Sequence, residues 1–112
     1  MPATFLHIDF AFPGPWGPAL AAACRELADD IAAEPGLRWK LWGEDAATGR
    51  ASGEYLFDTR EQAQRYLDKH RPRLAAFGVT QVDARLFEVN EPLSRTTRAP
   101  LVTADPGAAF DA

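Results

Sequence analysis

Residues 37–57 read LRWKLWGEDAATGRASGEYLF, and this stretch decides the fold. In its first half Leu37, Trp39 and Leu41 alternate with other side chains, which is the period of a β-strand. Residues 46–49 are small or polar and end in glycine, as the turn of a hairpin requires. The alternation resumes directly after this turn. The stretch therefore predicts two antiparallel strands joined by a tight turn.

A helix is predicted on the N-terminal side of this hairpin. Pro18 suits the first turn of a helix, where its missing N–H has no partner to lose. An apolar stripe at helical spacing follows from Leu20 to Ile31 and includes the single cysteine. Pro35-Gly36 ends the segment. We expect one helix from Pro18 to the residues just before this pair.

A second helix is predicted after the hairpin. Thr59, with Gln62 three residues later, has the form of a capping box that satisfies free N–H groups in a first turn. Pro72 is expected to end or kink this helix near His70. Gly78 is placed to cap the last turn.

Two further strands complete the pattern. Residues 4–12 and residues 80–89 both alternate apolar and polar side chains. The order is strand, helix, strand, strand, helix, strand, which is the ferredoxin-like βαββαβ arrangement of the α+β class. Right-handed crossovers place both helices on one face of a four-stranded antiparallel sheet.

The other face of this sheet is expected to form the contact of a homodimer. It mixes apolar and charged side chains, so it is too apolar to stay wet and too polar for a simple core. We assign to it Phe5, Trp42, Leu56, Phe87 and Val89 together with Asp9, Arg38, Lys40, Glu54 and Arg85. His7 and Asp9, paired with Arg85 or Lys40, are expected to form a buried polar network there rather than a catalytic site.

Composition bounds the remaining possibilities. A chain of 112 residues fits one domain, which we place at residues 1–94, followed by an arm over residues 95–112 that packs on the partner subunit or frays. The balance of 12 Lys+Arg against 16 Asp+Glu disfavours nucleic acid and anionic membranes as partners. Cys24 is the only cysteine, and no signal-like or membrane-spanning stretch is evident, so we expect a cytoplasmic protein.

Short ordered motifs give the chain a resemblance to a known family. They are Phe10-Ala11-Phe12 with Gly14-Pro15 and Gly17, Glu34-Pro35-Gly36 with Trp39-Lys40 and Trp42, Tyr55-Leu56-Phe57, Tyr66-Leu67 with Lys69-His70, Leu74 with Gly78-Val79, and residues 89–94. Over roughly Phe5 to Ser94 the chain resembles the YdhR-like monooxygenases, a part of the dimeric α+β barrel group. The resemblance implies a protomer that dimerises through its sheet and an oxygenation that often uses no metal or organic cofactor.

Four side chains are expected to line a pocket between the sheet and the helices. The alternation places Trp39 and Tyr55 on the helix-facing side of neighbouring strands, and Tyr66 and His70 share one helix face at a spacing of four. Gly53 removes a side chain from this layer and leaves volume for a ligand. The alternative is that the aromatic rings simply fill the core and that Gly53 marks a bulge.

Two more aromatic residues are candidates for contact with a substrate. Trp16 lies in the proline-glycine loop after the first strand, where it can act as a lid or as a packing anchor. Phe77 is expected at the end of the second helix, beside the same pocket.

These residues suit the oxidation of an electron-rich phenol or enol by dioxygen. The reaction needs a base to raise the electron density of the substrate and a dry pocket to protect the intermediate. We assign His70 as the base, Tyr55 or Tyr66 as donors to a substrate oxygen, and Trp39 as a stacking surface. The expected function is a monooxygenase without cofactor or metal, acting on a small aromatic or polyketide-like compound.

Other functions remain open at this point. The same pocket can hold a small apolar molecule without turnover, as a binding or sensing domain does. It can also support proton transfer, such as an isomerisation, through His70 alone. A histidine near a helix end can equally be a surface or capping residue.

Overall fold

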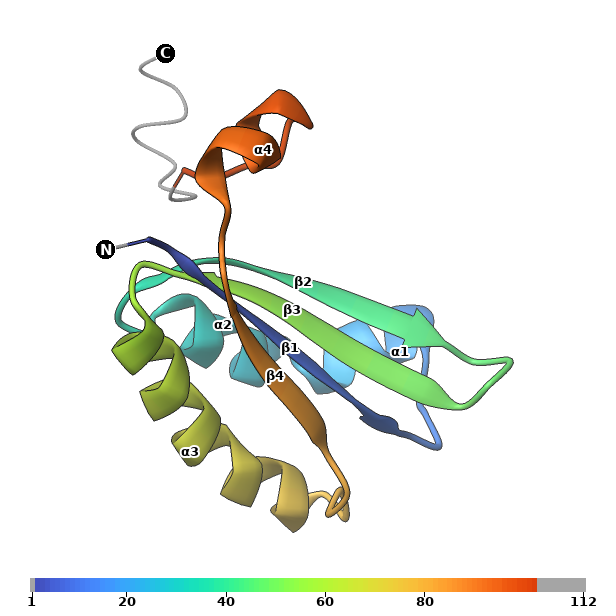
Figure 1. Cartoon of the computed structure of the whole chain (residues 1–112). Helices are drawn as coiled ribbons and strands as arrows, with labels where there is room; N and C mark the ends of the chain where they lie inside the picture. Colours follow the sequence, from blue (N-terminus) through green and yellow to red (C-terminus); the bar gives the residue numbers. More distant parts are fainter. Residues whose placement is uncertain (1, 103–112) are drawn as a thin grey trace.

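The computed structural model describes residues 2–102 and has the predicted order of elements (Figure 1). They are β1 (Thr4–Ala11), α1 (Gly17–Ala23), α2 (Arg25–Ala32), β2 (Leu37–Asp45), β3 (Arg50–Phe57), α3 (Arg60–Ala76), β4 (Asp83–Glu88) and α4 (Glu91–Thr96). The strands pair antiparallel in the order β2-β3-β1-β4. Helices α1, α2 and α3 lie on one face of the sheet and α4 lies on the other (Figure 1). The ferredoxin-like prediction is confirmed.

The central hairpin forms where it was predicted, but β2 contains an irregularity near its start. The register shifts between Leu37 and Trp39, after which Trp39 lies opposite Leu56 and Lys40 lies opposite Tyr55. An extra residue in one strand turns every later side chain to the other face. The expectation that Trp39 faces the helices is therefore wrong. Lys40 occupies that side instead.

The same shift corrects the face of Trp42, because Trp42 pairs with Gly53 in the layer below the helices. Lys40 and Trp42 thus leave the open face to which the alternation had assigned them. Leu41, which was expected inside, is exposed on the open side.

The first predicted helix is interrupted at one residue. Cys24 has φ −102° and ψ 12°, and it separates α1 from α2. The backbone bonds at this point persist, since Cys24 N–H donates to Leu20 and Ala28 N–H donates to Cys24. The break is a local irregularity in an otherwise continuous helical path.

The third helix begins as predicted, and its last turn is followed by Gly78 as predicted. Thr59 Oγ1 accepts from the Gln62 N–H at 3.2 Å, and Gly78 takes a positive φ of 85° after the final turn. The helix does not stop near His70, because α3 continues through Pro72 to Ala76. His70 and Leu74 on either side of Pro72 are both buried, and this packing holds the helix together across the proline.

The last strand is shorter than the alternation indicated. It starts at Asp83 rather than at Thr80, and its pairing with β1 stops at Asp9 opposite Asp83. The faces are as predicted, since Val82, Ala84 and Leu86 pack against the core. That core lies between the sheet and α3 and includes Leu6, Ile8, Tyr55, Phe57, Tyr66 and Leu67.

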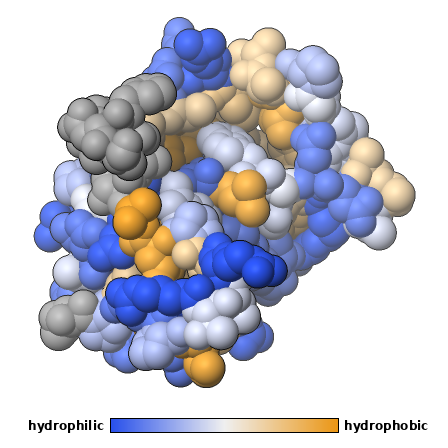
Figure 2. Space-filling view, turned by 90° about the horizontal axis from the view of Figure 1, so that it is seen from above, coloured by the Kyte–Doolittle hydropathy of each residue, from blue (hydrophilic) through white to orange (hydrophobic). Residues whose placement is uncertain are grey.

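The chain returns to the sheet after α4. Trp39 Nε1 donates to the Pro100 carbonyl at 2.7 Å, and Arg38 Nη1 donates to the Leu101 carbonyl at 2.5 Å. The described part of the predicted arm thus contacts β2 of its own chain. Residues 103–112 of that arm lie outside the described residues. Seen from above, apolar and hydrophilic residues alternate over the surface and do not separate into one large apolar area (Figure 2).

Candidate active site

A cavity of about 320 Å³ lies between the sheet and the helices. Phe12 and Pro15 line it from the loop after β1, and Cys24 lines it from the break between α1 and α2. The floor comes from β2 and β3, and the far wall comes from the C-terminal half of α3. Most of the lining is apolar, which suits a small ligand of aromatic or aliphatic character.

The structure brings together part of the predicted set. Gly53, Tyr55, His70 and Phe77 all line the cavity. Phe77 is 72% exposed, so it lies where the cavity meets solvent. Tyr66 is fully buried behind this layer and reaches the cavity only through its neighbours.

Trp16 and Trp39 do not belong to the lining among the described residues. Trp16 precedes α1 as its N-cap and packs edge-on against Phe12, with ring centroids 5.4 Å apart. It therefore supports the loop, which agrees with the packing anchor, one of the two alternatives for this position. Trp39 lies on the opposite face because of the shift in β2.

The two tyrosines form a hydrogen-bonded pair at the base of the cavity. Tyr66 Oη donates to Tyr55 Oη at 3.3 Å, and their ring centroids are 4.9 Å apart. Burial raises the pKa of Tyr66 to about 12 and raises that of Tyr55 further. Both phenols keep their protons at neutral pH. Because the Tyr55 oxygen accepts from Tyr66, its own proton is available to a ligand.

His70 is held in one orientation by charged neighbours. Arg73 Nε donates to His70 Nδ1 at 3.2 Å, and Asp30 holds the Arg73 guanidinium at 2.5 Å. Burial, followed by the charges of Lys40 and Arg73, lowers the pKa of His70 to about 3. The imidazole is therefore neutral, and the bond from Arg73 places its single proton on Nε2. This arrangement makes His70 a hydrogen-bond donor and a poor base.

Lys40 is a cavity residue that the alternation pattern had placed on the wrong face. Its Nζ lies 3.3 Å from the ring centroid of Trp42 and 4.7 Å from that of Tyr55. Burial lowers the pKa of Lys40 to about 7. Only a register shift near Leu37 brings this amine inside, and residue types alone carry no signal of that shift.

Gly53 makes room for protein atoms as well as for a ligand. A Cβ at this position would lie 2.8 Å from Tyr55 Cε1 and 3.1 Å from Lys40 Cε. The Tyr55 ring and the Lys40 stem therefore lie across the strand at Gly53. Glycine here allows both polar groups to approach the cavity.

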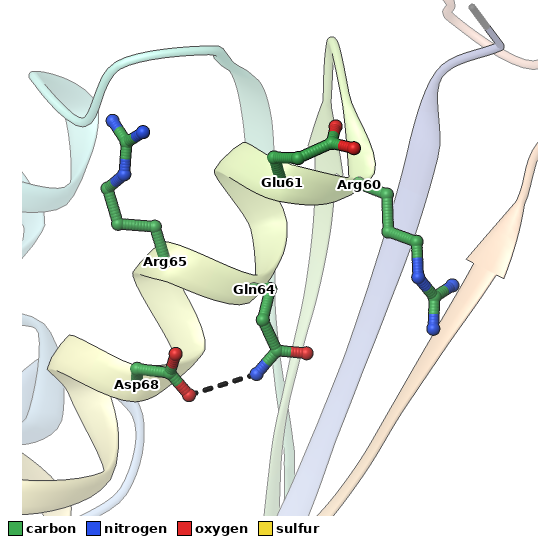
Figure 3. A pocket seen from close by; sticks show the side chains of 5 residues that line it. All are labelled: Arg60, Glu61, Gln64, Arg65 and Asp68. Atoms are coloured by element: carbon green, nitrogen blue, oxygen red, sulfur yellow. Dashed lines mark hydrogen bonds between the residues drawn. The ribbon is translucent and has the colours of Figure 1, made fainter.

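Two other hollows lack this character. The outward face of α3 carries a shallow site lined by charged or polar side chains, in which Gln64 donates to Asp68 at 2.9 Å (Figure 3). Its side chains are those of Arg60, Glu61, Gln64, Arg65 and Asp68, and apart from the bonded pair Gln64 and Asp68 they point in different directions (Figure 3). We regard it as a solvated helix surface.

The second hollow is on the open face of the sheet, where the predicted polar network forms with different partners. His7 lies 2.5 Å from Glu54 and 2.7 Å from Asp9, and Arg50 binds Asp9 from the next strand. Although burial acts to lower it, the pKa of His7 is raised by its hydrogen bonds to Asp9 and Glu54. Arg85 lines the same hollow, whereas Lys40 is on the other face.

Comparison with solved structures supports the ferredoxin-like fold. SnoaB, a cofactor-independent oxygenase from Streptomyces nogalater, is 14% identical, with a TM-score of 0.58 over 80% of this chain and 95% of that chain. A structure described as a putative antibiotic biosynthesis monooxygenase from Deinococcus radiodurans is 20% identical, with a TM-score of 0.53 over 78% of this chain and 92% of that one.

A dimeric ferredoxin-like protein of unknown function from Thermobifida fusca is also 20% identical, with a TM-score of 0.54 over 79% of this chain and 92% of that one. At these identities the likeness concerns the fold. The chain itself belongs to the family described as "Putative mono-oxygenase ydhR", whose model matches residues 5–100. The family assigns the chain to the monooxygenases, which are oxidoreductases.

No curated protein matches the chain significantly. Within residues 2–102 no helix has the length and apolar character to cross a membrane.

Proposed function

We propose that the protein oxidises a small aromatic or polyketide-like compound with dioxygen and that it needs no metal or organic cofactor. The observation that carries this proposal is the mostly apolar cavity in which the polar groups of Tyr55 and His70 converge. The family assignment supports the monooxygenase class. The description of SnoaB as cofactor-independent supports the absence of a cofactor.

The proposed reaction balances without a further reductant. Loss of a proton makes the substrate an anion whose carbon attacks dioxygen and forms a C–O bond. The peroxide takes up a proton and then eliminates water, which leaves a carbonyl group on that carbon. The C–H and O–H bonds of the phenol or enol, which correspond to the methylene group of its keto form, supply all four electrons, and one oxygen atom ends in the product and the other in water. The apolar lining protects the peroxide from bulk solvent.

In this proposal Tyr55 and His70 donate hydrogen bonds to the substrate oxygen. Both are neutral donors at neutral pH, and donors aimed at a developing anion stabilise it strongly in a water-poor site. Tyr66 positions Tyr55 through the bond between their hydroxyl groups. Phe77 and Gly53 shape the space for the substrate.

Oxygen uptake with a panel of phenols and hydroquinones tests this function. The parent protein is expected to consume one dioxygen for each carbonyl formed, and Tyr55→Phe and His70→Ala are expected to lower kcat/KM by about 10- to 1000-fold. Circular dichroism checks that each variant is folded. Binding of the same compounds without any oxygen uptake by the parent would instead identify a non-catalytic binding or sensing domain. That alternative is favoured by the fact that none of Tyr55, Tyr66 and His70 is a suitable base.

We further propose a homodimer formed through the open face of the sheet, with residues 1–94 as the domain and residues 95–112 as an arm. Phe5 and Phe87 stack there at 5.9 Å, and Phe87 is 49% exposed. The Thermobifida fusca protein is described as dimeric, which supports this assembly. A cytoplasmic location is also proposed, and the single cysteine supports it.

A further inference from the structure

The cavity contains a basic group, the amine of Lys40, that has no role in the reaction as described above. Lys40 extends from β2 beneath the helices, and its Nζ lies over the faces of Trp42 and Tyr55. The negative faces of aromatic rings attract a cation, so these rings hold the amine in the cavity. Gly53 leaves the space through which the Lys40 stem passes.

Within the part of the chain that the structure describes, no carboxylate forms an ion pair with this amine. Those that face it are Arg73 and His70 from α3, Cys24 between α1 and α2, and Tyr55 from β3, while Glu44 lines the cavity from the end of β2. The Glu44 carboxylate accepts a hydrogen bond from the Gly17 N–H at 2.9 Å. None of the ion pairs within residues 2–102 includes Lys40.

We propose that Lys40 takes the proton from an acidic hydroxyl of the substrate and then holds the resulting anion as its counter-ion. The O–H bond of the substrate breaks and an N–H bond forms on Lys40, and no electron leaves either group. This step rests on the oxygenase function proposed above and specifies its substrate. The cavity selects phenols and enols over their ethers and over hydrocarbons.

The chemistry of the site agrees with this assignment. Burial holds the pKa of Lys40 at about 7, so near neutrality a large fraction is the free amine that can accept a proton. After the transfer the ammonium and the new anion neutralise each other in a site without another carboxylate partner. Tyr55 and His70 keep their own protons and can donate to the same oxygen.

The ionisation of bound 4-nitrophenol, followed by its visible absorbance under nitrogen, tests this role. The parent is compared with Lys40→Met, which keeps the length of the side chain without the amine. Arg65→Gln is the matched control, since it removes one positive charge from the exposed face of α3. Binding of 4-nitroanisole, which has no acidic proton, reports whether the cavity of each variant is intact.

In the parent and in Arg65→Gln, binding is expected to raise the ionisation constant of 4-nitrophenol by about 10-fold or more, as a cation within a few ångströms does. In Lys40→Met the constant is expected to be at least about 10-fold lower than in the parent, because the anion keeps the donors Tyr55 and His70 but loses its counter-ion. Affinity for 4-nitroanisole is expected to stay within about 2-fold in all three proteins.

An ionisation constant that is as high in Lys40→Met as in the parent overturns the proposal. If that variant does not fold, the parent alone decides, because a constant that is unchanged or lowered on binding also overturns it. The test uses no oxygen, so its outcome is separate from that of the uptake experiment. A Lys40-dependent shift in a protein that consumes no oxygen would retain the phenol-binding role of Lys40 and reject the oxygenase.

Discussion

Some residues of the cavity serve the proposed function and at the same time lower the stability of the folded protein. Lys40 is the clearest case, because its amine lies among aromatic rings without an ion pair within residues 2–102. Desolvation of an ammonium is unfavourable unless a partner compensates for it. A substrate anion would supply that partner.

Lys40→Met is expected to raise the free energy of unfolding by about 1–3 kcal/mol near pH 6 and by less near pH 9. The folded pKa of about 7 lies below the ordinary value of 10.5, so the unfolded chain binds more protons between these values. The parent therefore gains stability as pH rises through this window, and Lys40→Met loses that part of the dependence. Urea denaturation across the window measures it, and an equal pH slope in parent and variant would contradict the prediction.

Gly53→Ala is expected to destabilise the protein by about 1–3 kcal/mol, because the new Cβ overlaps the Tyr55 ring and crowds Lys40. Combining it with Tyr55→Leu removes the overlap. The double variant is then expected to cost clearly less than the sum of the single changes. Thermal and urea unfolding of the four proteins measure the coupling, and simple additivity would show that the Tyr55 ring does not lie over Gly53.

Individual elements deviate from their sequence patterns in ways that matter for the site. The shift in β2 exchanges the faces of Trp39 and Lys40, and it turns an aromatic floor into one that carries an amine. It also directs Trp39 to the open side beside Arg38, where these two side chains donate to the carbonyls of Pro100 and Leu101. The register shift in β2 thus places Lys40, the proposed base, in the cavity. It also places Trp39 where it binds the chain after α4.

Pro72→Ala is expected to stabilise the protein by about 1–3 kcal/mol, since alanine restores a helical hydrogen bond within α3 and removes the clash of the ring with the preceding turn. Arg71→Ala at the exposed neighbouring position serves as a control and is expected to change stability by less than about 0.5 kcal/mol. The midpoints of urea denaturation compare the two. A loss of stability in Pro72→Ala would show that the rigidity of proline in the unfolded chain outweighs its cost in the helix.

The whole molecule has two unlike faces on one sheet. The helices cover a cavity on one side, while the other side keeps stacked Phe5 and Phe87 beside the His7 cluster. Packing of a second copy on that open face would bury both rings and the charged groups together. The proposed dimer therefore depends on the apolar contact in particular.

Phe87→Glu is expected to convert the proposed dimer to a monomer at micromolar concentration. The new carboxylate would lie in the centre of the contact, where burial without a partner costs several kcal/mol. Light scattering coupled to size-exclusion chromatography measures the mass. Gln64→Glu, at an exposed position on the outward face of α3, is the control for added charge. A parent that is monomeric, or a variant that stays dimeric, would reject this interface.

The amino-acid sequence by itself determined the order of the strands and helices, the capping of α3 and the tight hairpin turn. These depend on local spacing and on the residues that begin and end each element. It also identified Gly53, Tyr55, His70 and Phe77 as neighbours of the cavity, because their positions follow from uninterrupted periodicity.

Only the tertiary structure decided which face Trp39, Lys40 and Trp42 occupy, that α3 passes through Pro72, and that His70 is a neutral hydrogen-bond donor. A one-residue shift in β2 depends on pairing with β3, and the ionisation of His70 depends on burial and on Arg73 from the next turn. Pairing, burial and distant charge exist only once the chain has folded, so no local pattern could have specified them.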